Sequence, residues 1–84
     1  MITHKDNKKN DFIDIEDTVR ITYVRQKSRS KNKNWSRKDT IRFQAYKGGK
    51  NNALHRGAEI PLYTETTLLE LIQALCELYK TQIK

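Results

Sequence analysis

Apolar and polar residues alternate along two segments in the first two-thirds of the chain. In residues 19–25, V-R-I-T-Y-V-R, Val19, Ile21 and Tyr23 fall on one side of an extended backbone. In residues 40–46, T-I-R-F-Q-A-Y, the apolar residues at 41, 43 and 45 share one side in the same way. A period of two residues is typical of a half-buried strand. The pattern therefore predicts strands over residues 19–25 and 40–46.

Two weaker extended segments flank this pair. Residues 11–17, D-F-I-D-I-E-D, alternate loosely and are expected to form a short first strand whose carboxylates can also pair with basic residues. Residues 54–62 place Ala58, Ile60 and Leu62 on one side, and Pro61 favours a sheet edge. The Gly- and Asn-containing residues 47–52 predict a turn, and residues 26–38 a long exposed loop or hairpin tip. The polar residues 1–10 are expected to be a disordered N-terminal arm.

The last segment has a helical period. Thr64 is a suitable N-cap, and Glu65 in the first turn complements the helix dipole. The apolar positions that follow are 68, 69, 71, 72, 75, 76, 78 and 79, which span about 180° of a helix at 100° per residue. We therefore predict an α+β domain over residues 11–84. It has an antiparallel three- to four-stranded sheet followed by one C-terminal helix packed on one face (ββββα). The opposite, uncovered face would carry Arg20, Thr22, Val24, Arg42, Gln44 and Tyr46.

The apolar arc of the predicted helix is wide for so narrow a sheet. Part of the arc is left over, and a second copy of the chain is the simplest candidate to cover it; a wider contact with the sheet is the alternative. Cys76 falls on the apolar side, where we expect a buried structural thiol. The expected dimer interface consists of Leu69, Ile72, Cys76, Leu78 and Tyr79.

Positive charge is concentrated in the middle of the chain. The 84 residues carry a formal net charge of +7. Residues 18–57 contain twelve Lys or Arg but a single acidic residue, Asp39, whereas the flanking segments 1–17 and 58–84 each have a net charge of −2. Segregation of this kind indicates a polyanionic partner. A basic surface kept for solubility is the alternative.

Aromatic residues are interleaved with these basic residues. Lys and Arg neutralise phosphates, and aromatic rings stack on unpaired bases. Trp35 lies in the basic loop, where it either stacks on a base or anchors the loop to the sheet. The candidate nucleic-acid contacts are Arg20, Arg25, Lys27, Arg29, Lys31, Lys33, Trp35, Arg37, Lys38, Arg42, Tyr46, Lys47, Lys50 and Arg56. The predicted helix is acidic on its polar side, so single strands are favoured over major-groove recognition of a duplex.

The sequence lacks the usual signatures of catalysis and of metal or cofactor binding. Cys76 is the only cysteine, and neither His4 nor His55 has a partner at helical metal-site spacing. Glycine-rich nucleotide loops and nucleophile elbows are absent from the sequence. We expect a protein that is not an enzyme and uses no cofactor or metal. No apolar run approaches the ~18 residues of a membrane span, and the polar start predicts no signal peptide. The expected location is therefore the cytoplasm or the nucleoid.

Two runs, I-R-F-Q-A-Y-K-G-G and H-R-G-A-E-I-P-L-Y-T-E-T-T-L-L-E-L-I-Q-A-L, resemble a known family. It is that of the transcriptional coactivator positive cofactor four, and the similarity is greater to its small bacterial members. The matching features are the Ile41-Arg42 strand start, the turn at 47–52, the Arg56-Gly57 pair, the short strand at 60–62 and the cap Thr64. Residues 11–17 and Trp35 also have counterparts. The Pur-type nucleic-acid-binding repeat has a similar order of elements and is a second candidate.

This resemblance implies a ββββα chain that dimerises through its helix and holds single-stranded DNA against basic, aromatic-bearing sheet ridges. Together with the charge distribution, it predicts a single-stranded nucleic-acid-binding protein, with DNA favoured over RNA and a role in transcription or replication. The alternative is a protein-interaction module whose apolar helix side holds a partner and whose basic centre meets an acidic surface.

Overall fold

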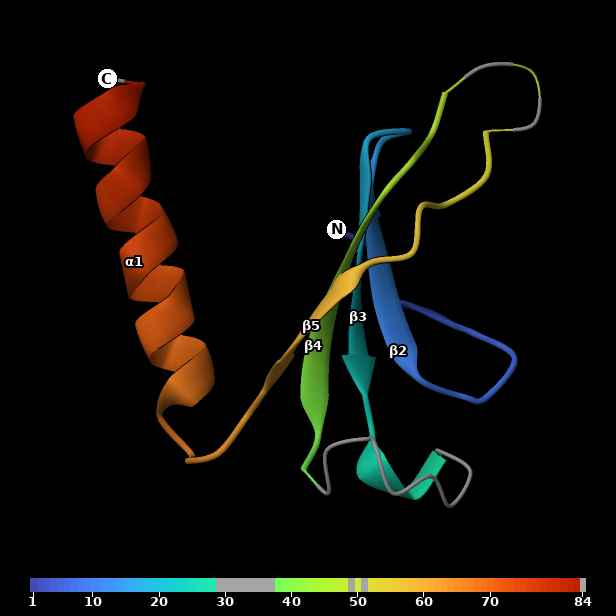
Figure 1. Cartoon of the computed structure of the whole chain (residues 1–84), viewed down its shortest axis with the longest axis horizontal. Helices are drawn as coiled ribbons and strands as arrows, with labels where there is room; N and C mark the ends of the chain where they lie inside the picture. The colour runs from blue at the N-terminus through green and yellow to red at the C-terminus, as the bar shows by residue number, and fades with distance from the viewer. Residues whose placement is uncertain (29–37, 49, 51, 84) are drawn as a thin grey trace.

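An antiparallel sheet of five strands forms the body of the protein in the computed structural model, which describes residues 1–28, 38–48, 50 and 52–83 (Figure 1). The strands lie side by side in chain order. They are β1 (His4–Lys5), β2 (Asp11–Ile15), β3 (Val19–Val24), β4 (Thr40–Ala45) and β5 (Ala58–Pro61). A short 3-10 helix, η1 (Gln26–Ser28), follows β3, and the α-helix α1 (Thr67–Gln82) follows the sheet. The expected α+β class and ββββα order are confirmed, with β1 as an additional strand.

The register of the central strands explains which face of the sheet is apolar. Ile21 of β3 lies opposite Ile13 of β2 and Phe43 of β4, and Tyr23 lies opposite Ile41. Partners in an antiparallel pair point to the same face. The alternation that predicted β3 and β4 therefore produces one apolar face, and this face is turned towards α1, because its residues line a cleft together with leucines of the helix.

The strand β1 comes from residues 1–10, which we expected to be a disordered arm. His4 pairs with Phe12 and Lys5 with Asp11 at the edge of the sheet. The turn that follows is closed by Asp6, whose Oδ1 accepts hydrogen bonds from the backbone N–H groups of Lys8 and Asn10. A polar segment is thus ordered by an Asx-type turn and by strand pairing. Apolar periodicity in the sequence does not predict either feature.

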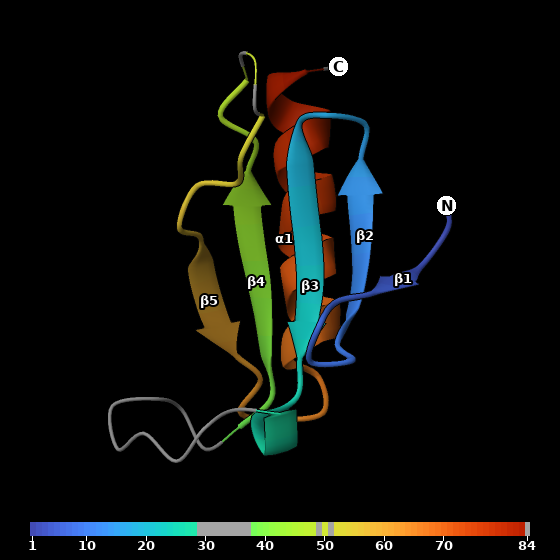
Figure 2. The same cartoon turned by 90° about the vertical axis from the view of Figure 1, so that its right-hand side faces the viewer.

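This N-terminal segment covers part of the face that points away from α1. The side chain of Asn10 accepts a hydrogen bond from the backbone N–H of Arg25, and the chain before β2 crosses in front of the end of β3 (Figure 2). Thr22 and Val24 are each only 2% exposed. The prediction that these two residues lie on a bare face is therefore wrong, although they do point away from the helix.

The helix begins three residues later than its expected cap. Thr66, not Thr64, occupies the N-cap position, and its side chain makes no hydrogen bond to the helix backbone. The Thr66 hydroxyl instead donates to the carboxylate of Glu70. The Thr64 hydroxyl lies within hydrogen-bond distance of the hydroxyls of Thr66 and Thr67. Thr64 therefore belongs to the turn that leads into α1.

The helix stands beside the apolar face of the sheet and diverges from it along its length (Figure 1). None of the residues of α1, all of which the structure describes, is buried. Leu69 is 60% and Leu78 57% exposed. Cys76 is also exposed, so the expected buried thiol is wrong for this chain on its own. Close packing of α1 on the sheet is therefore missing.

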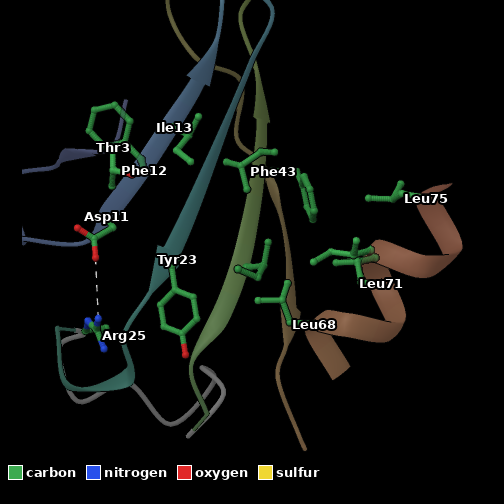
Figure 3. Close-up of a pocket in the computed structure, with 13 residues that line it drawn as sticks. Thr3, Asp11, Phe12, Ile13, Tyr23, Arg25, Phe43, Leu68, Leu71 and Leu75 are labelled. Atoms are coloured by element: carbon green, nitrogen blue, oxygen red, sulfur yellow. Dashed lines mark ion pairs between the residues drawn. The ribbon is translucent and has the colours of Figure 1, made fainter. Parts of the chain in front are cut away.

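Between α1 and the sheet lies an open cleft of about 600 Å³. Figure 3 shows Leu68, Leu71 and Leu75 of the helix facing Phe43 and Tyr23 across it. We call this the apolar cleft. The apolar side chains that line it would form the core of the domain if α1 packed directly against the sheet.

Candidate nucleic-acid interface

Two of the predicted arginines lie together on the sheet face that points away from α1. Arg20 of β3 is the register partner of Gln44, and Arg42 of β4 is the partner of Thr22. Adjacent strands thus present the two guanidinium groups on one surface. We call this surface, carrying Phe12, Asp14, Arg20, Arg42, Gln44 and Glu59, the arginine face.

The guanidinium of Arg20 is fixed by three side chains. Its Nε and Nη2 donate to the two carboxylate oxygens of Asp14 at 2.8 and 3.1 Å, and Nη2 also donates to the hydroxyl of Tyr46 at 3.0 Å. The group lies over the ring of Phe12, with Cζ 3.9 Å from the centroid. The hydrogen bond from Arg20 holds the pKa of Asp14 below its usual value. Arg20 is therefore positioned rather than mobile.

Arg42 is held in a comparable way at the other side of the face. Its Nε and Nη2 lie 3.2 Å from one carboxylate oxygen of Glu59 on β5, and the Thr40 hydroxyl donates to the other oxygen. The acidic residues of β2 and β5 thus neutralise part of the positive charge of the basic centre. The expectation that the 11–17 segment pairs with basic residues is confirmed by Asp14 and Arg20.

Arg56 reaches this region because the chain after His55 approaches β4 very closely. A Cβ on Gly57 would collide with the carbonyl oxygen of Phe43, so only glycine permits the approach. The Gln44 amide also donates to the carbonyl oxygen of His55. Arg56 is exposed and lines a shallow pocket with Arg42, Gln44, Gly57 and Glu59. Arg42 and Arg56, both candidate contacts, therefore line the same pocket.

Arg25 belongs to the opposite side of the sheet. It lines the apolar cleft beside Tyr23, with its guanidinium 5.4 Å from that ring, and it pairs with Asp11 at 3.9 Å (Figure 3). Arg25, which was expected in the basic loop, thus follows the alternation of β3 onto the side opposite Arg20.

Two further predicted residues, Lys27 and Lys38, lie near this end of the sheet, and both are exposed. They sit where the basic loop leaves and rejoins the sheet. Asp39 ties the two ends of the loop together, since it accepts hydrogen bonds from the backbone N–H of Gln26 and from the Tyr23 hydroxyl, both at 2.8 Å. These bonds lower the pKa of Asp39, the Gln26 bond contributing most. Arg29, Lys31, Lys33, Trp35 and Arg37 lie outside the described residues.

The turn at the other end of the sheet carries Lys47 and Lys50, which are exposed. The side chain of Asn52 accepts from the backbone N–H of Gly48, which has the positive φ of 75° that favours glycine. Six-residue strands such as β3 and β4 span about 20 Å. Lys27 and Lys38 at one end of the sheet and Lys47 and Lys50 at the other are therefore separated by the arginine face.

Sequence reasoning missed three residues of the arginine face and its edge. Phe12, Asp14 and His4 come from segments that carry net negative charge, and charge was the signal used. The rings of His4 and Phe12 lie 5.6 Å apart. The pairing of His4 with Phe12 depends on the turn at Asp6, so residue spacing alone did not reveal it.

The expected dimer residues are spread over both the sheet side and the two flanks of α1. At 100° per residue, Ile72 and Tyr79 point towards the sheet side with Leu68 and Leu75, Leu69 and Cys76 lie on one flank, and Leu78 lies on the other. Ile72 lines the apolar cleft. All five are exposed. An interface that buried them would have to wrap around the helix and enter the cleft.

Within the described residues, no group of three or more His, Cys, Asp or Glu side chains is arranged to hold a metal ion. No helix in the described part of the chain is long and apolar enough to cross a membrane.

The chain matches no protein-family model, and neither the curated proteins nor the solved structures contain a significant match to it. The resemblance to the positive cofactor four family is thus left as an expectation from the sequence.

Proposed function

We propose that this protein binds single-stranded nucleic acid without catalysing a reaction, with DNA favoured over RNA. The arginine face is the observation that carries the proposal, because it offers two ordered guanidinium groups between two basic ends of the sheet. Such a path suits the repeating phosphates of an extended strand. The family resemblance agrees with this function and with a role in transcription or replication, in the cytoplasm or nucleoid.

Single strands are favoured over duplexes by the character of α1. Its polar side exposes Glu70 and Glu77, which repel phosphates, so α1 is unsuited to the major groove. A sheet face with basic ends and aromatic rings instead fits unpaired nucleotides, whose bases are open to stacking.

The ion pairs of the arginine face are compatible with phosphate binding. The side chains of Arg20 and Asp14 are 25% and 29% exposed, so water and salt reach the pair. Pairs of this kind contribute at most about 1 kcal/mol. A phosphate can compete with the carboxylate, while the ion pair keeps the guanidinium in place beforehand.

The salt dependence of binding tests the proposal. Fluorescence anisotropy is measured with oligo-dT, oligo-rU and a duplex at several salt concentrations. If about five phosphates are neutralised, log affinity falls against log salt with a slope near −3.5, since each contact contributes about 0.7 for single strands. Lys47→Ala should lower the slope by about 0.7, whereas Lys80→Ala, which removes an exposed charge from α1, should leave it unchanged. Absence of binding at low salt, or a slope near zero, would contradict the proposal.

We further propose that the active form is a homodimer in which the apolar side of α1 enters the cleft of a second copy. The exposed Leu69, Leu78 and Tyr79 and the open cleft support this, because one chain provides both an apolar helix and an apolar surface that could receive it. The same cleft is the observation that favours the alternative, a protein-interaction module. A chain that stays monomeric but captures an acidic partner would support that alternative.

A further inference from the structure

An aromatic pair lies at the β1 edge of the arginine face. The rings of His4 and Phe12 have centroids 5.6 Å apart and planes inclined by 33°. The two residues are register partners in the pairing of β1 with β2, so both side chains point to the side of the sheet that carries Arg20, although Phe12 also lines the apolar cleft. His4 is exposed and Phe12 half-buried. The pair is therefore not a part of the apolar core.

Arg20 extends this aromatic pair across the sheet. Its guanidinium lies over the Phe12 ring at 3.9 Å and 5.9 Å from the ring centroid of Tyr46. Its Nε and Nη2 protons are directed to Asp14 and Tyr46. The hydrogen-bonding edge of the guanidinium is thus occupied, and the group lies over the Phe12 ring. His4, Phe12, Arg20 and Tyr46 form a continuous row of flat groups from β1 to the end of β4.

Flat π-systems and guanidinium planes at a solvated surface are the groups that stack on unpaired bases. Phe12 also lines the apolar cleft, but its ring lies beside His4 and under the guanidinium of Arg20 on the other side of the sheet. We propose that His4 and Phe12 form a stacking site for one unpaired base, with Arg20 fixing the Phe12 ring. This inference rests on the proposed function and assigns it a base-contacting site.

The test compares His4→Ala and Phe12→Leu with the wild-type chain on two probes. One probe is a fluorescein-labelled oligo-dT, and the other has the same length and charge but abasic positions. Loss of one stacked base should weaken oligo-dT binding by about 5- to 100-fold, with the salt slope unchanged. The same variants should bind the abasic probe as the wild type does. Tyr63→Ala, which removes an exposed aromatic ring near the start of α1, is the control and should bind as the wild type.

The outcomes separate this site from the general function. If the wild type binds neither probe, the proposed function is wrong and the stacking site falls with it. If the wild type binds oligo-dT and His4→Ala binds equally well, the stacking site alone is wrong. A variant that loses affinity equally for both probes, with a lowered melting temperature, would assign the pair to structure and overturn the inference. His4→Ala is the cleaner variant, because its exposed side chain contributes little to folding.

Discussion

At the scale of single residues, the arginine face is a set of cations that already have anionic partners. The Asp14 carboxylate accepts hydrogen bonds from the guanidinium of Arg20, and the Glu59 carboxylate accepts one from that of Arg42. Each carboxylate occupies the position that a phosphate would use. If the protein binds phosphates as proposed, it exchanges one anion for another, which weakens single contacts and keeps the cations ordered.

Asp14→Asn tests this exchange. The variant removes the competing charge, so its affinity for oligo-dT at low salt should rise by up to about 5-fold, the equivalent of about 1 kcal/mol. Asp17→Asn makes the same charge change in the exposed turn before β3 and serves as the control. Equal effects of the two variants in anisotropy would show that only net charge matters.

The same variant should change the response to acid. The pKa of Asp14 is lowered from 3.8, chiefly by the Arg20 hydrogen bond. The pair therefore stabilises the fold above pH 3.8 and this stabilisation is lost as pH falls through the folded-state pKa. In urea unfolding, the difference between wild type and Asp14→Asn should be present at pH 6 and vanish near pH 2. A difference that is constant across this range would contradict the assignment.

At the scale of elements, apolar periodicity predicted the type of most segments. β3 and β4 were expected at 19–25 and 40–46 and run over Val19–Val24 and Thr40–Ala45, because the same alternation that marks a strand fills one face of the sheet. β1 was missed because it is formed by a local polar turn and by pairing with Phe12 and Asp11. The separation of Arg25 from Arg20 follows from strand alternation and was within reach of the sequence.

The exposed side of α1 makes a prediction of its own. Leu69→Ala and Leu78→Ala remove apolar groups that are exposed in the single chain, so the unfolding of the isolated chain should barely change. In a two-fold symmetric dimer each substitution is present twice, and the dissociation constant should rise by at least about 10-fold. Sedimentation of the wild type and of Gln73→Ala, on the polar side of α1, provides the comparison. A monomeric wild type at tens of micromolar would exclude the dimer.

At the scale of the whole molecule, the sequence predicted a basic central segment, but it did not predict how its basic residues are distributed over the sheet. Among the described basic residues of the central segment, Lys27, Lys38, Lys47 and Lys50 lie towards the two ends of the sheet, and Arg20 and Arg42 lie on one face, because β3 and β4 run in opposite directions. The angle between α1 and the sheet could not be predicted from the sequence either, because the residue pattern within a helix does not determine how far it lies from the sheet. A strand bound along the arginine face would run between the two basic ends.

The apolar cleft also bears on how the stability of this protein is to be understood. Because leucines and isoleucines line the open apolar cleft, much of the apolar surface that could stabilise the fold on burial remains exposed in the single chain. If that surface is covered only by association, the folded state gains stability by mass action, and the unfolding midpoint depends on the amount of protein present. Dilution would then act on this domain as a mild denaturant, and nucleic-acid binding would weaken at concentrations where the sheet itself no longer persists.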